Sequence, residues 1–109
     1  MLWNPKHDEV KPLLDLSKPS IQALSYALRH KETWPEEFIW NFNECHTCAM
    51  GLACKLWNLI DPNTFTVSRA IGIDWPASGY VFLRGGYGGV CGSKITPEMV
   101  ANQLDKLIA

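Results

Sequence analysis

The sequence predicts a single, compact, mainly α domain of four to five helices, to which a short two-stranded piece could be added. Apolar residues recur at helical spacing in three separate segments, and residues that start and stop helices flank them. No repeat, linker or low-complexity stretch divides the 109 residues, of which 47% are hydrophobic. An α+β arrangement is the alternative fold.

The N-terminal residues 1–16 have a different character from the rest of the chain. They mix charges with Trp3, Pro5 and Pro12 and offer only a short leucine patch. Such a segment is typical of an arm laid over a domain. We therefore expect an arm at 1–16 and the domain at 17–109.

The first helix is expected over 17–31. Pro19 suits a first turn, and Ile21, Leu24 and Leu28 recur at helical spacing, with alanines on the same face. Together these positions make one buried stripe.

Between this helix and the cysteines the pattern is weaker. Thr33 and Glu36 have the spacing of a capping box, which predicts at most a short helical turn over 33–38. The aromatic run 38–42 suits a short strand or a helical turn, and five residues do not decide between them.

A central helix is expected over 43–60. Asn43 is a good N-cap, and Asp61-Pro62 would end the helix. Its apolar face is formed by Cys48, Leu52, Leu56, Leu59 and Ile60. We expect this helix to pack against 17–31 and 96–108.

The remaining elements follow from their end signals. Asn63 and Gly72 bracket a short helix over 65–72. Residues 80–83 suit a strand or a helical turn, and five glycines among residues 85–92 predict a loop. Thr96-Pro97-Glu98 opens a last helix over 96–108, with its buried face formed by Val100, Leu104, Leu107 and Ile108.

Three of the four cysteines lie within residues 45–54, which allows a redox interpretation. Cys45 would sit in the first turn of the central helix, where amide groups stabilise a thiolate, and Cys48 is three residues on, near enough to resolve a mixed disulfide. A strand at 38–42 would complete the context that thioredoxin-like enzymes use. However, Glu44 opposes ionisation of Cys45, and no Trp-Cys dipeptide is present.

A structural zinc site is the second interpretation. Cys45 and Cys48 would form a hook, and His46 and Cys91 would complete a tetrahedron. Cys54 would point to the opposite side of the helix from Cys45. A second paired motif, which would make this pattern strong, is missing from the sequence.

The third interpretation, which we favour, is a buried helix wall of small residues. Cysteine is among the most buried residue types, and a mid-helix glycine suggests a close neighbour. The wall would consist of Cys48, Ala49, Gly51, Leu52 and Ala53.

Composition narrows the function classes. A formal net charge of −1 gives no basic surface for nucleic acid or anionic lipid, and no segment approaches the roughly 18 apolar residues of a membrane span. Without a secretion signal we expect a cytoplasmic protein. The glycine loop lacks the spacing of phosphate-binding motifs, so no cofactor is expected. Most of the five tryptophans are expected in the core, and aromatic residues exposed together would bind a protein partner or a second copy of the chain.

Two stretches, CHTCAMGLACKLW (45–57) and ITPEMVANQLDKLIA (95–109), resemble a group of small uncharacterised bacterial and phage proteins. These proteins pair a Cys-Ala-x-Gly-x-Ala helix with a Thr-Pro-Glu-x-Val-Ala C-terminal helix. The likeness covers about a quarter of the chain. It implies a small helical domain and no activity. The sequence thus favours a non-enzymatic interaction or structural module.

Overall fold

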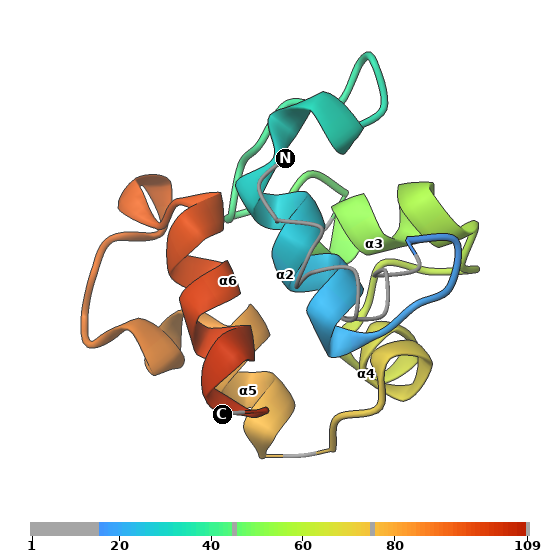
Figure 1. Cartoon of the computed structure of the whole chain (residues 1–109). Helices are drawn as coiled ribbons and strands as arrows, with labels where there is room; N and C mark the ends of the chain where they lie inside the picture. Colours follow the sequence, from blue (N-terminus) through green and yellow to red (C-terminus); the bar gives the residue numbers. More distant parts are fainter. Residues whose placement is uncertain (1–15, 45, 75, 109) are drawn as a thin grey trace, which may run out of the picture.

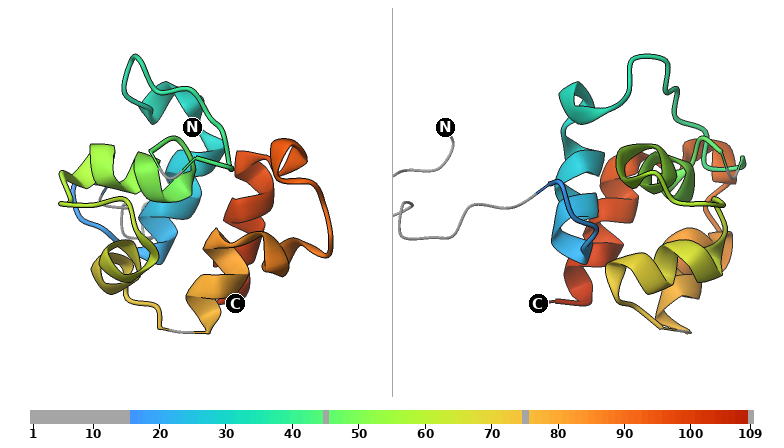
Figure 2. Two further views of the ribbon diagram at one scale, coloured as in Figure 1. Left: turned by 180° about the vertical axis from the view of Figure 1, so that it is seen from behind. Right: turned by 90° about the vertical axis from the view of Figure 1, so that its right-hand side faces the viewer.

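The computed structural model describes residues 16–44, 46–74 and 76–108 and has two layers of helices (Figures 1 and 2). One layer holds α2 (Ile21–Arg29) and α6 (Pro97–Lys106), and the other holds α3 (Ala49–Trp57), α4 (Thr64–Ile71) and α5 (Ala77–Phe82). Short 3-10 helices are η1 (Lys31–Thr33), η2 (Arg84–Tyr87) and η3 (Gly92–Lys94). The described part of the chain contains no strand, and the mainly α prediction is confirmed. The predicted arm, apart from Leu16, lies outside the described residues.

Helix α2 forms inside the predicted range 17–31 but is shorter: Pro19 precedes the N-cap Ser20 instead of lying in the first turn, and the helix ends at Arg29. The Ser20 side chain accepts a hydrogen bond from the Ala23 amide at 3.0 Å, which satisfies one of the unpaired groups of the first turn. Leu24 and Leu28 are fully buried, so the predicted stripe faces the core.

Helix α6 has the predicted start but a shorter buried face. The Thr96 side chain caps it, Pro97 is in the first turn, and Val100 and Leu104 are fully buried. The prediction that Leu107 and Ile108 are buried is wrong, because the helix ends at Lys106 and both side chains are exposed.

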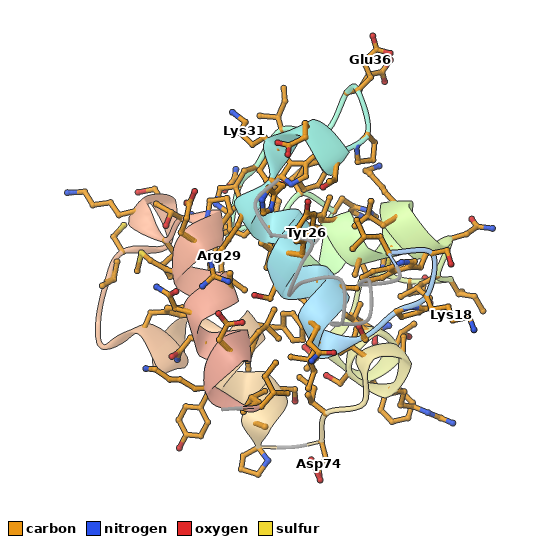
Figure 3. All side chains as sticks on the ribbon, viewed as in Figure 1. Lys18, Tyr26, Arg29, Lys31, Glu36 and Asp74 are labelled. Carbon is orange, nitrogen blue, oxygen red and sulfur yellow. The ribbon has the colours of Figure 1, made fainter. Side chains whose placement is uncertain are left out.

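A polar cluster clasps α2 to α6. Arg29 forms an ion pair with Asp105 at 2.8 Å, and the Ser25 hydroxyl donates to the same carboxylate at 2.7 Å. Arg29 also donates to the side chain of Asn102 at 2.6 Å. Ser25 thus pairs with Asp105, and Arg29, further along α2, reaches back to Asn102. This reversed order shows that the two helices are antiparallel. Figure 3 shows Arg29 between them.

Helix α3 begins later than predicted. Its N-cap is Cys48, so the expectation that Asn43 caps a helix over 43–60 is wrong. Of the described residues before it, 42, 43, 46 and 47 lie in turns, and the Asn41 amide donates to the Thr47 carbonyl at 2.9 Å. Because Cys48 has an extended backbone conformation, the helix cannot continue back into these turns.

Helix α3 also ends earlier than Asp61-Pro62. Asn58 adopts the left-handed conformation at φ 53°, and the Leu59 amide bonds to the Cys54 carbonyl at 3.1 Å, a common helix ending. Ile60 therefore leaves the helix and is 89% exposed, contrary to its expected place on the buried face. Helix α3 contacts α2 and α4, while the α2–α6 pair forms the most extensive helix contact.

The regions that the sequence left open form helices and turns. Residues 80–82 belong to α5, and 38–42 form neither strand nor helix. The glycine-rich loop contains the two short helices η2 and η3. Helix α4 has the predicted brackets, with Asn63 as its N-cap and Gly72 left-handed at φ 85°.

The described helices are all far shorter than a membrane span. The α6 helix has ten residues, and the helices of the described ranges lack the length and apolar character needed to cross a bilayer.

The clasp between α2 and α6 gives a first prediction. Replacing Asp105 with alanine removes the acceptor of the Ser25 hydroxyl and the ion-pair partner of Arg29, which should lower the free energy of unfolding by about 1 kcal/mol. Chemical denaturation measures this change. Lys106→Ala, at the neighbouring exposed position, is the control and should have little effect; equal losses in the two variants would contradict the clasp.

Candidate functional site

Of the three cysteines in the segment 45–54, the structure describes Cys48 and Cys54. Cys48 is 3% exposed at the start of α3, while His46 and Cys91 are exposed. Cys45 lies outside the described residues. The Cys45–Cys48 redox pair therefore stays a prediction.

The predicted zinc ligands do not gather in the described part of the chain. Within residues 16–44, 46–74 and 76–108, no group of three or more His, Cys, Asp or Glu side chains is placed to hold a metal ion. His46, Cys48 and Cys91 thus form no such group with other described residues, and the role of Cys45 is untested.

The buried wall of small residues is confirmed. Cys48, Ala49, Gly51, Leu52 and Ala53 are all buried. The close neighbour of Gly51 is the backbone of His46, because a Cβ at position 51 would overlap the His46 carbonyl. Glycine is therefore needed where the turns before α3 fold back onto the helix, and not where another helix approaches.

The environment of Cys54 works against ionisation. Partial burial raises the pKa of its thiol above the usual value, and the carboxylate of Asp61 raises it further. Since the thiolate is the nucleophile, this cysteine is a poor reaction centre.

A row of aromatic rings is the most distinctive feature of the described chain. Trp34 packs edge-on against Phe38 with centroids 5.2 Å apart, and the centroids of Trp34 and Trp40 are 6.5 Å apart. The row continues to Phe42, whose ring centroid is 6.4 Å from that of Trp40, and then to Tyr87, whose centroid is 5.5 Å from that of Phe42. It links the segment after η1 to η2.

The row is mostly buried, in line with the expectation that most tryptophans lie in the core. Phe38, Phe42 and Tyr87 are buried, and Trp34 and Trp40 are half-buried. The exposed aromatic residues of the described chain are Tyr26, Phe65 and Tyr80, which lie on three different helices.

The polar atoms of the row point inward. Trp34 donates its indole N–H to the Ala27 carbonyl at 2.7 Å, and Trp40 donates to the Ile95 carbonyl at 2.8 Å. The Tyr87 hydroxyl donates to a backbone carbonyl, and burial raises the pKa of the phenol. The indole rings are thus fixed in orientation, and their outer surface is apolar.

This outer surface lines a groove beside the first turn of α6. The groove has a volume of about 480 Å³ and is lined by Leu28, Lys31, Trp34, Phe38, Ile39, Trp40, Thr96, Pro97 and Glu98. Ile39 is 75% exposed. We call this the aromatic groove. Lys31, one of its lining residues, is labelled in Figure 3 and shows where the groove lies in the molecule.

Two charged residues belong to different walls of the aromatic groove. The Lys31 ammonium lies 5.8 Å from the centre of the Trp34 ring, a cation–π distance. Glu98 comes from the first turn of α6. The groove therefore presents apolar surface with one charge of each sign.

Sequence reasoning missed this groove. The tryptophans at positions 34 and 40 were recognisable as core or interface residues, but no local pattern indicates that Pro97 and Glu98 lie against them. The pairing of α2 with α6 creates this neighbourhood.

Comparison with known proteins assigns this chain to no family. No protein-family model, curated protein or solved structure matches the chain.

The fold-back of the turns before α3 gives a second prediction. A Gly51→Ala change should lower the free energy of unfolding by about 2 kcal/mol, because the new methyl group overlaps backbone that cannot rotate away. In an ordinary helix the same change would be stabilising. Gly85→Ala, where a Cβ meets nothing within 4 Å, is the control. Thermal denaturation compares the two; a Gly51→Ala variant as stable as the parent would refute the close approach.

The Cys54 environment gives a third prediction. A raised pKa means less thiolate at a given pH. At about pH 8, iodoacetamide should therefore alkylate Cys54 more slowly in the folded protein than in the unfolded chain. Peptide-resolved mass spectrometry after iodoacetamide treatment measures the rate. Asp61→Asn removes one cause of the shift and should speed the reaction, whereas an unchanged rate would show that Asp61 has no effect on this thiol.

Proposed function

We propose that the chain is a small, non-enzymatic binding module whose aromatic groove takes an extended peptide segment of a protein partner. The observation that carries the proposal is the inward hydrogen bonding of Trp34 and Trp40. With their N–H groups already satisfied, the rings offer apolar surface to a partner without a polar atom to desolvate.

The groove suits a proline-containing or otherwise apolar peptide. Extended, proline-rich segments dock in grooves lined by aromatic residues, because their conformation is already restricted before binding. The row of rings and Pro97 supply such a lining, and the volume of about 480 Å³ accommodates a few side chains. Lys31 and Glu98 are placed to orient a peptide that carries one charge of each sign.

Thiol chemistry has less support. Cys48 is buried and Cys54 has a raised pKa, and neither feature suits an attacking thiolate. The proposal places the module in the cytoplasm, where reduced thiols are usual.

The test uses peptides selected from a displayed library of random peptides on the immobilised full chain. We expect a consensus with proline or large apolar residues, and binding of a synthetic consensus peptide that quenches or shifts tryptophan fluorescence. Ile39→Ser should weaken this binding roughly tenfold, because it removes an exposed apolar side chain from the groove.

Ile60→Ser is the matched control. Ile60 is also an exposed isoleucine, but it does not line the aromatic groove, so its replacement should leave the affinity unchanged. Equal effects of the two changes, or no consensus peptide, would refute the proposal. Sedimentation that shows a dimer dissociated by Ile39→Ser would also refute it, since a second copy would then occupy the groove.

A further inference from the structure

A second hollow lies between α4 and α5, at the opposite end of the molecule from the aromatic groove. Its volume is about 370 Å³, within the usual range of small-molecule sites. Phe65 and Ile73 provide apolar lining, and Ser68 and Ser78 line it as well. Asp74 also lines the hollow. In Figure 3 it lies at one end of the molecule, and Lys31 of the aromatic groove lies at the opposite end.

One residue that lines the hollow carries an unsatisfied polar group. Ser68 is 6% exposed, and its hydroxyl is the one buried side-chain nitrogen or oxygen in the described ranges that lacks a hydrogen-bond partner. A serine within a helix often donates to the carbonyl four residues earlier, but Ser68 does not. A buried hydroxyl without a partner destabilises the fold, so its presence beside a hollow points to a ligand that supplies the partner.

The apolar lining of the hollow favours a ligand with a flat aromatic ring. Phe65 is exposed at the hollow, and the guanidinium of Arg69 lies 5.1 Å from the centre of its ring. This cation–π contact restrains the ring of Phe65, which lines the hollow. Aromatic rings gain from packing against one another beyond the area they bury.

The charges at the hollow favour a neutral ligand. Arg69 and Asp74 have opposite signs, and neither forms an ion pair with another described residue. The hollow therefore has no net charge from these side chains to attract an anion or a cation.

From these observations we propose that the hollow between α4 and α5 binds a small neutral aromatic molecule that carries a hydroxyl group, a phenol in chemical class. The ring packs against Phe65 and Ile73, and the ligand hydroxyl exchanges a hydrogen bond with the hydroxyl of Ser68. This inference is independent of the peptide-binding proposal, because the two sites share no lining residue.

The test compares p-cresol with toluene, which has the same ring and methyl group but no hydroxyl. In amide correlation spectra of the full chain, p-cresol should shift resonances of residues 64–78 with a dissociation constant of about a millimolar or tighter, and toluene should bind more weakly. Ser68→Ala should weaken p-cresol binding about fivefold and leave toluene binding unchanged. The same change should raise the melting temperature of the ligand-free protein, because it removes the unsatisfied hydroxyl.

A matched pair of aromatic variants tests the ring contact. Phe65→Ala should weaken the binding of both ligands, while Tyr80→Ala, an exposed aromatic on α5 that does not line the hollow, should change neither. Absence of saturable shifts at residues 64–78 would overturn the inference. So would equal p-cresol affinity in the parent and Ser68→Ala proteins, or equal losses in the Phe65→Ala and Tyr80→Ala variants.

Discussion

The antiparallel pairing of α2 with α6 is the constraint on which the rest of the structure depends. Leu24 and Leu28 on α2 and Val100 and Leu104 on α6 are all fully buried in one core. Interdigitation of these side chains sets how far one helix lies along the other, and the directional hydrogen bonds of the Arg29–Asp105 clasp favour the same register. With that register fixed, the start of α6 lies beside the segment that follows α2, and the aromatic groove forms between them. Further along α6, Gln103 donates to the carbonyls of Tyr80 and Gly86, which holds α5 and η2 against the same helix.

The two candidate sites differ in how they treat buried polar atoms. In the aromatic groove, each indole N–H of Trp34 and Trp40 is satisfied within the protein, so the surface left for a partner is apolar. Beside the hollow between α4 and α5, the Ser68 hydroxyl is unsatisfied within the protein, and the proposed ligand would supply its partner. The first arrangement suits a peptide held mainly by apolar contact, and the second suits a small molecule held by one specific hydrogen bond. A single fold thus presents two surfaces with different recognition chemistry at its two ends.

The cysteine helix shows how tertiary contacts override a good local signal. Asn43 is a favourable cap by its side chain, yet the Thr47 carbonyl accepts from the Asn41 amide and the extended backbone of Cys48 keeps the helix from starting earlier. The chain can fold back onto α3 because Gly51 has no Cβ to meet the His46 carbonyl. At the other end, Asn58 adopts a left-handed conformation that its short polar side chain tolerates, which ends the helix before the Asp61-Pro62 signal. The buried character of Cys48 and its neighbours was nevertheless predictable, because it follows from residue size and spacing alone.

The sequence by itself determined the fold class, the course of α2 and α4, the start of α6 and the burial of the cysteine wall. These features depend on spacing and on caps such as Asn63 and Thr96, whose hydrogen bonds reach only a few residues along the chain. Only the tertiary structure decided the late start of α3, the exposure of Ile60, and both candidate sites. Trp34 and Pro97 are far apart in sequence, and the lack of a partner for Ser68 is a property of its surroundings. Such features arise when distant segments pack together, and no local pattern of residues records which segments will meet.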